Sequence, residues 1–163
     1  MSSNKDKPHI LVLPEDDANR QIANGFILDI SLNSHAIQVL PAARGWKDVV
    51  EKFTNSYAST MRQYPHRMIA LLIDFDGNED RLSYVKDKIP DELENRVFVL
   101  GVLSEPERLR KDIKRNFEKI GEALAKDCSD NTNNLWGHDL LKHNQTELAR
   151  MILSVKPFLF NLK

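Results

Sequence analysis

Short apolar runs divide the chain and predict four buried strands. The runs cover residues 10–14, 36–40, 68–75 and 97–103 and are rich in branched aliphatic side chains. They lack regular polar alternation, and strands that are apolar on both faces belong to a sheet covered on both sides, which is mostly parallel. We therefore expect a mostly parallel, four-stranded central sheet.

The segments between these runs have the apolar spacing of helices. An apolar stripe over residues 22–30 predicts a first helix that Asp16 or Asp17 caps. Stripes at three- and four-residue steps predict further helices over residues 46–64, 79–88 and 106–125, and Pro65 ends the one over 46–64. The polar segment 127–134 predicts a surface loop, and a last helix is expected over residues 138–155. The order βαβαβαβα with a C-terminal helix predicts an α/β fold, a three-layer sandwich with a mostly parallel sheet.

Length and composition indicate one cytoplasmic domain. With 163 residues, we expect a disordered lead over residues 1–8 and a single α/β domain over residues 9–163. No apolar run approaches the roughly 18 residues that span a bilayer, so no membrane association is expected. A polar N-terminus and the single Cys128 are typical of a protein in the reducing cytosol. The net charge of −1 means that nucleic acid could bind only at a local basic patch.

Acidic residues follow the first and third predicted strands. Glu15 ends the first strand, and Asp74 and Asp76 end the third. The carboxyl ends of parallel strands meet at one edge of a sheet, and residues two apart point the same way, so Asp74 and Asp76 should converge while Phe75 enters the core. We predict that Glu15, Asp74 and Asp76 bind Mg²⁺ or Mn²⁺, with Glu105 after the fourth strand as a further ligand.

The alternative interpretation is that these acids are loop residues and helix caps. It suits Asp16 or Asp17, either of which can cap the first helix. It suits Asp74 and Asp76 less well, because two carboxylates directly after a very apolar run need a partner of opposite charge.

The Glu15 and Asp74-Phe75-Asp76 pattern resembles the Toprim domain of topoisomerases, primases and OLD-type nucleases, over about residues 9–103. The resemblance implies a Mg²⁺-dependent, nuclease-like protein that acts on nucleic-acid phosphodiesters. In that case Glu15, Asp74 and Asp76 are catalytic residues as well as metal ligands.

The chain also resembles the receiver domain of response regulators. Residues 10–13 lead into the acids at 15–17, and the resemblance makes Asp74 the phosphoacceptor, Ser104 the switch hydroxyl and Lys156, before Pro157, the lysine at the edge of the sheet. A third alternative is a non-catalytic interaction domain on the same fold, with a protein partner or a second copy of the chain against its helices.

Two further groups of side chains are candidate contacts to phosphate or nucleic acid. The first is in the opening turn of the first helix, where free N–H groups favour anions, and comprises Asn19 and Arg20. The second recurs at three- and four-residue steps along the fourth helix and comprises Arg108, Lys111, Arg115 and Lys119. Interspersed acids make a solvated helix face the alternative interpretation, and no aromatic residue in this line indicates base stacking.

Overall fold

Parallel strands form the centre of the molecule, as the apolar runs predict. The computed structural model describes residues 5–78 and 80–160. The strands are β1 (His9–Pro14), β2 (Ile37–Val39), β3 (Arg67–Leu72) and β4 (Val97–Leu100). They form one four-stranded, all-parallel sheet in the order β2-β1-β3-β4. The predicted fold class is therefore confirmed, and the sheet is wholly rather than mostly parallel.

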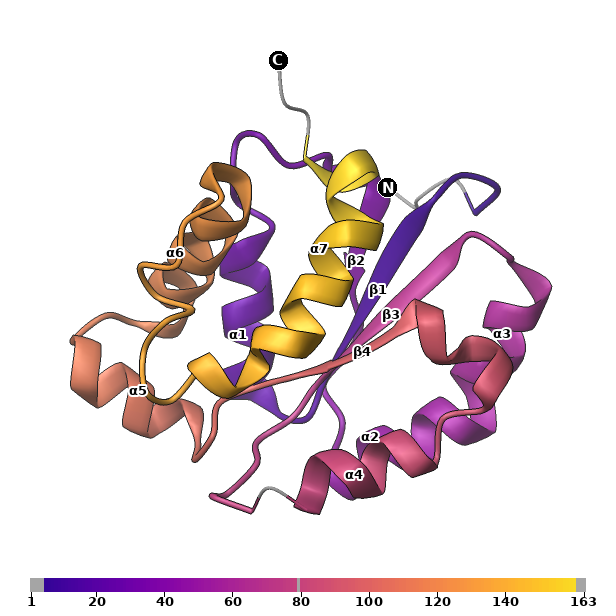
Figure 1. Cartoon of the computed structure of the whole chain (residues 1–163), viewed down its shortest axis with the longest axis horizontal. Coiled ribbons are helices and arrows are strands. Elements are labelled where there is room, and N and C mark those ends of the chain that lie inside the picture. Colours follow the sequence, from indigo (N-terminus) through magenta and orange to yellow (C-terminus); the bar gives the residue numbers. More distant parts are fainter. Residues whose placement is uncertain (1–4, 79, 161–163) are drawn as a thin grey trace.

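Helices cover both faces of the sheet and complete a three-layer sandwich (Figure 1). One face carries α1 (Asp17–Phe26), α6 (Phe117–Asp130) and α7 (Gln145–Leu159), with α5 (Pro106–Ile113) beside them. The other face carries α2 (Trp46–Lys52), α3 (Ala58–Gln63) and α4 (Asp80–Asp87). Successive residues of β1 alternate between the two cores, because strand side chains point to opposite faces.

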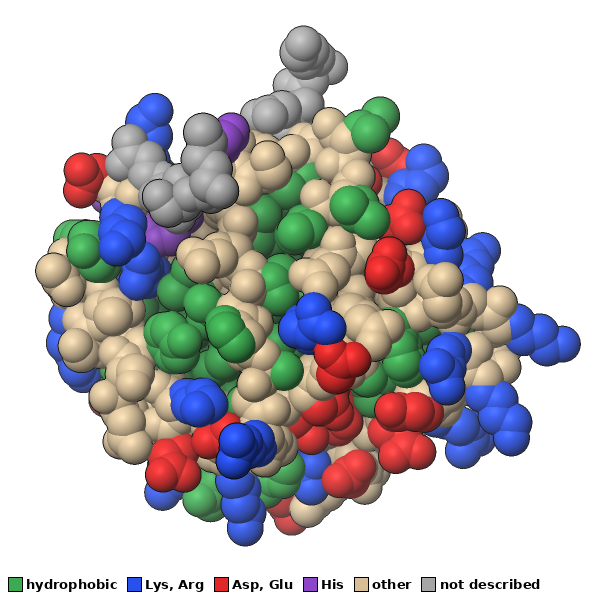
Figure 2. Space-filling model, turned by 180° about the vertical axis from the view of Figure 1, so that it is seen from behind, with side chains coloured by type: hydrophobic (Ala, Val, Ile, Leu, Met, Phe, Trp, Pro, Cys, Tyr) green, Lys and Arg blue, Asp and Glu red, His purple; other side chains and the backbone are tan. Residues whose placement is uncertain are grey.

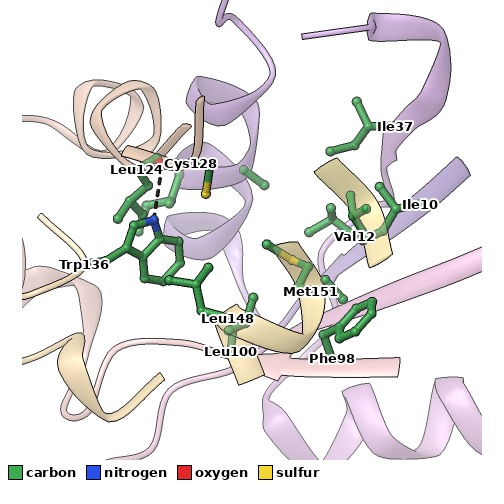
Figure 3. Close-up of a cluster of buried hydrophobic side chains, with 14 of the residues drawn as sticks. Ile10, Val12, Ile37, Phe98, Leu100, Leu124, Cys128, Trp136, Leu148 and Met151 are labelled. Carbon is green, nitrogen blue, oxygen red and sulfur yellow. Dashed lines mark hydrogen bonds between the residues drawn. The ribbon is translucent and has the colours of Figure 1, made fainter. Parts of the chain in front are cut away.

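The core beneath α1, α6 and α7 is wholly apolar around a buried tryptophan (Figure 3). The Trp136 indole Nε1 donates to the carbonyl oxygen of Leu124 at 3.1 Å, which satisfies its polar atom. Cys128 lies in the same core, where burial raises the pKa of its thiol to about 12. The cysteine is therefore a packing residue rather than a nucleophile.

The helix α7 closes the outer edge of β4, where a fifth strand would otherwise pair. Alternate residues of a parallel strand direct their peptide groups to the same edge. Side chains three residues apart bind these groups: Asn144 binds the N–H and C=O of Gly101, Glu147 accepts from the N–H of Val99, and Arg150 donates to the C=O of Val97. The helix thus replaces the hydrogen bonds of a strand.

The prediction of one continuous fourth helix over residues 106–125 is wrong. The structure divides it into α5 and α6, because Lys114 adopts a left-handed conformation with φ of 56°. Asn116 then begins a new helix by accepting a hydrogen bond from the Lys119 N–H at 2.8 Å. The two helices therefore point in different directions, and their charged faces do not form one line.

The predicted surface loop over residues 127–134 is confirmed for residues 131–134, which are exposed, and is wrong for residues 127–130. Helix α6 continues to Asp130, and Asp127 is buried because it accepts hydrogen bonds from Thr132 and from three backbone N–H groups. The last helix is shifted towards the C-terminus. It follows a short 3-10 turn η4 (Lys142–Asn144), begins at Gln145 and continues through Pro157 to Leu159.

The first helix ends at Phe26, short of the predicted Ile30, which is exposed outside it, whereas the second and third predicted helices agree closely with their ranges. The second predicted helix is continuous, although a π-helical turn, η2 (Phe53–Tyr57), separates α2 from α3. Residue 79, the first of the predicted third helix, lies outside the described residues. So do residues 1–4 of the predicted disordered lead. In the part of the chain that the structure describes, every helix is too short or too polar to cross a membrane.

Candidate metal centre

The acids after β1 and β3 lie at the switch point of the sheet. From β1 the chain crosses to β2 on one side, whereas β3 and β4 lie on the other side. Doubly wound sheets bind their ligands in the crevice that this reversal opens at the carboxyl ends of the strands. Acidic side chains gather over this end of the molecule in Figure 2, below the sheet as drawn in Figure 1.

Three carboxylates converge at this edge of the sheet, and we refer to their place as the acidic crevice. One oxygen each from Glu15, Asp16 and Asp74 lies within 4.8 Å of the others. A Mg²⁺ ion with bonds of about 2.1 Å separates opposite ligand oxygens by about 4 Å. Small side-chain rotations would therefore let the three carboxylates share one ion, and an all-oxygen set is the one that Mg²⁺ prefers.

Hydrogen bonds hold one oxygen of each carboxylate and leave the other open. Glu15 Oε1 accepts from the Asp74 N–H at 2.8 Å. The Asn19 side-chain amide donates to Asp16 Oδ1 at 2.9 Å and to Asp74 Oδ1 at 2.8 Å. No described residue donates to the second oxygen of any of the three. This arrangement positions the carboxylates and keeps three oxygens available for a cation.

Burial and mutual repulsion make the site costly to ionise. Desolvation raises the pKa of Asp74 to about 7; the hydrogen bond from Asn19 lowers it in part, and the charges of Glu15 and Asp16 raise it further. Desolvation also raises the pKa of Glu15, against the hydrogen bond from the Asp74 N–H. A divalent cation would remove this penalty, because it favours the ionised carboxylates.

The structure does not place Asp76 in this cluster. Asp76 has a left-handed conformation with φ of 49°, so the strand rule that residues two apart share a direction no longer applies to it. Its side chain is 60% exposed and pairs with Arg81 at 3.2 Å. The same guanidinium donates to the main-chain oxygen of Asp74 at 2.6 Å, so it joins the two acids through the backbone of one and the carboxylate of the other.

The other predicted contacts at this edge have different environments. Glu105 is exposed, precedes α5 and is not one of the three converging acids, whereas the charge of Glu107 acts on Asp74. Asn19 is fully buried against the carboxylates, so its amide orients the acids rather than facing a phosphate. Arg20 pairs with the exposed Asp17 one turn earlier.

The predicted line of cations on one helix is divided between two. Arg108 and Lys111 belong to α5, Arg115 lies in the connection, and Lys119 belongs to α6. Arg108 pairs with Asp112 and Lys119 pairs with Glu122, as the solvated-face interpretation expects. Lysine and arginine side chains project from the flank that these helices form, away from the acidic crevice (Figure 2).

The two other residues that the receiver resemblance requires lie at opposite ends of the molecule. Ser104 follows β4 at the acidic edge, and its Oγ is buried without a hydrogen-bond partner among the described residues. Lys156 lies near the far end of α7 and donates to the main-chain oxygen of Cys128 and to Asn131 Oδ1. No lysine from α7 therefore reaches Asp74.

Sequence reasoning missed two members of the site. It treated Asp16 mostly as a cap, although this residue caps α1 and also lies in the cluster of acids that could hold a metal ion. It gave Arg81 no role, because the contact to Asp74 depends on the turn that follows β3. The three consecutive acids at 15–17 were a usable signal for Asp16, whereas no local pattern distinguishes Arg81.

Comparison with known proteins finds no matching family model, no similar curated protein and no similar solved structure.

Proposed function

We propose that the protein is a Mg²⁺-dependent enzyme that acts on the phosphodiester bonds of nucleic acid, with Mn²⁺ as a substitute ion. The observation that carries this proposal is the convergence of Glu15, Asp16 and Asp74, each with one oxygen held and one open. Three acids this close together, one buried and two half-buried, repel one another when ionised and are well suited to a hard divalent ion.

Each residue has a distinct part in this proposal. Glu15, Asp16 and Asp74 hold the ion, and Asn19 fixes the rotamers of two of them through one amide. Bound Mg²⁺ supplies positive charge to the phosphoryl group and lowers the pKa of an attacking water. Arg81 is anchored on Asp74 and places a fixed positive charge at the edge of the crevice, where a phosphate oxygen can bind.

The test is cleavage of end-labelled single-stranded and duplex DNA and RNA in Mg²⁺, in Mn²⁺ and in excess chelator. We expect cleavage only with a divalent ion, and a loss of at least about 100-fold in Asp74→Asn and Glu15→Gln, because each removes one charged ligand. Binding of Mg²⁺ measured by calorimetry should fail in the same variants. Intact substrate under all conditions, with normal Mg²⁺ binding, would refute the catalytic part of the proposal.

Matched variants separate the metal ligands from the neighbouring acids. Asp17→Asn removes an exposed carboxylate next to the site and should leave cleavage unchanged. Asp76→Asn distinguishes the two possible ligand sets: a small effect supports Asp16 as the third ligand, and a large one supports the Asp74 and Asp76 pair.

A second candidate function is that of a receiver-like signalling domain with Asp74 as phosphoacceptor. It is favoured by the strand order β2-β1-β3-β4, which corresponds to the first four strands of the flavodoxin-like arrangement, and by the unpartnered Ser104 hydroxyl at the same edge. The position of Lys156 weighs against it. Incubation with radiolabelled acetyl phosphate should label Asp74 in this case, whereas a phosphodiesterase would remain unlabelled.

A further inference from the structure

An aromatic and basic surface lies beside the acidic crevice, where α2 and α4 run next to one another (Figure 1). Trp46, the first residue of α2, makes an edge-to-face contact with Tyr84 of α4, with ring centroids 5.3 Å apart. Tyr84 is nevertheless 45% exposed. One ring is therefore supported from the side and open to solvent.

Three cations surround these two rings. The Arg81 guanidinium lies 4.5 Å from the centroid of the Trp46 ring, and Lys47 Nζ lies 5.7 Å from the same centroid. Lys88 Nζ lies 5.2 Å from the centroid of Tyr84. Aromatic side chains interleaved with cations are the combination that binds single strands, because bases stack on the rings while phosphates pair with the charges.

Two contacts join this surface to the acidic crevice. Arg81 packs on Trp46 and also donates to the main-chain oxygen of Asp74. On the other side, the N–H of Gly45, directly before Trp46, donates to the main-chain oxygen of Glu15 at 3.1 Å. The rings are thus tied to the backbone of two of the acids, so a strand lying across them would lie beside the crevice.

The cations on α5 and α6 have a ring beside them that is not open to solvent: the Arg110 guanidinium lies 4.7 Å from the centroid of Phe117, which is only 6% exposed. Lys119 pairs with Glu122, and Lys126 pairs with Asp130, so acids neutralise part of that surface. The large exposed side chains near it are the aliphatic Leu28 and Ile30, which offer no π-face for stacking. This flank is therefore the weaker candidate for contact with a single strand.

We propose that Tyr84, supported by Trp46, stacks a base of single-stranded nucleic acid, while Lys47, Lys88 and Arg81 contact its phosphates. The inference rests on the proposed function, because it names the substrate class of the same site. It assigns the preference for a single strand to Tyr84, since a base must leave its duplex to stack on a side chain.

The experiment measures binding without chemistry. A fluorescent oligothymidylate of about 12 nucleotides is titrated with the full chain in excess chelator, and anisotropy is compared with that of a duplex of equal length. We expect tighter binding of the single strand, and a loss of about tenfold in affinity for Tyr84→Ala, since one stacked base contributes roughly that much. Lys47→Ala and Lys88→Ala should each weaken binding and reduce its dependence on salt.

Matched controls decide where the strand lies. Tyr64 also has two cations at its ring, Lys5 and Arg67, but precedes β3 at the opposite end of the sheet, so Tyr64→Ala should retain full affinity. Lys119→Ala and Lys126→Ala on α6 should also bind normally. Unchanged affinity of Tyr84→Ala, or a loss confined to the α6 variants, overturns the inference.

The two proposals fail in different ways. Asp74→Asn should bind the single strand normally in chelator and yet fail to cleave it, because it removes a metal ligand and no stacking surface. Binding that depends on Tyr84 without any cleavage would refute only the proposed chemistry. Cleavage with no effect of Tyr84→Ala on affinity would refute only this inference.

Discussion

Two buried acids have opposite electrostatic environments. Asp74 lies at the carboxyl edge of the sheet, and Glu147 lies at the side of β4. Their exposed fractions are almost the same, 7% and 4%. Burial raises the pKa of Glu147, but hydrogen bonds from Lys86, the Val99 N–H and Arg150 outweigh it, so that the pKa lies below its usual value. The chain therefore supplies every partner that this carboxylate needs.

Asp74 receives fewer stabilising contacts from the chain than Glu147 does. Burial raises its pKa, Asn19 offsets only part of that rise, and the acids Glu15 and Asp16 add to it. Burial alone therefore does not distinguish the two acids, since both are buried to almost the same extent. The informative feature is a buried carboxylate whose nearest charged neighbours are other carboxylates, because such a group is neutral when protonated and unfavourable when ionised unless a cation binds beside it.

The largest effect on stability should come from removing Glu147, the acid whose hydrogen bonds the chain itself supplies. Glu147→Ala leaves Lys86 and Arg150 without their shared carboxylate and the Val99 N–H without its acceptor. We expect a loss of about 3 to 5 kcal/mol in the free energy of unfolding, measured by urea denaturation. Glu92→Ala, which breaks the exposed pair with Arg62, should cost less than about 1 kcal/mol. Equal losses of unfolding free energy in Glu147→Ala and Glu92→Ala would show that the buried contacts of Glu147 are no stronger than an exposed ion pair.

Removing the unsatisfied acid should have the opposite sign. Asp74→Asn keeps the shape of the side chain and removes a charge that is unfavourable when ionised, so the metal-free protein should gain about 1 to 3 kcal/mol at pH 8. The same urea titration measures this gain. Asp17→Asn is the control, and it should change stability little because Asp17 is exposed. A destabilised Asp74→Asn protein would show that groups of the chain itself stabilise the ionised carboxylate of Asp74.

The pH dependence of stability should reveal the same acid. Asp74 has a folded pKa of about 7, above its ordinary value of 3.8, so the native state binds more protons between these values. Its contribution to the free energy of unfolding therefore decreases as pH rises from 4 to 7, by about 1 kcal/mol for each pH unit. Melting temperatures across this range should show the decrease in the wild type and lose it in Asp74→Asn. Saturating Mg²⁺ should also abolish it, since the ion favours the ionised form.

The smallest effect on stability is expected at Asp16, whose two roles can be separated. Asparagine caps helices as well as aspartate does, so Asp16→Asn should preserve α1 and change stability by less than about 0.5 kcal/mol. The same variant removes one charged ligand, and its affinity for Mg²⁺ should fall at least about tenfold by calorimetry. Unaltered Mg²⁺ affinity would restrict Asp16 to capping.

The sequence alone determined the class of fold and the edge on which the acids meet. Strands that are apolar on both faces require cover on both faces, and the helical crossovers between them make such strands parallel. Parallel strands then bring Glu15 and Asp74 to the same edge whatever the details of the helices. These conclusions depend on periodicity and chain direction, which a sequence displays directly.

Only the tertiary structure decided which side chains complete the site and the sheet. Asp16 rather than Asp76 joins Glu15 and Asp74, because Asp76 itself has a left-handed backbone conformation and the chain changes direction there. Helix α7 closes β4 through contacts between residues 43 to 53 positions apart in sequence. Such pairings depend on how distant elements pack, and the local spacing of apolar and polar residues carries no information about them.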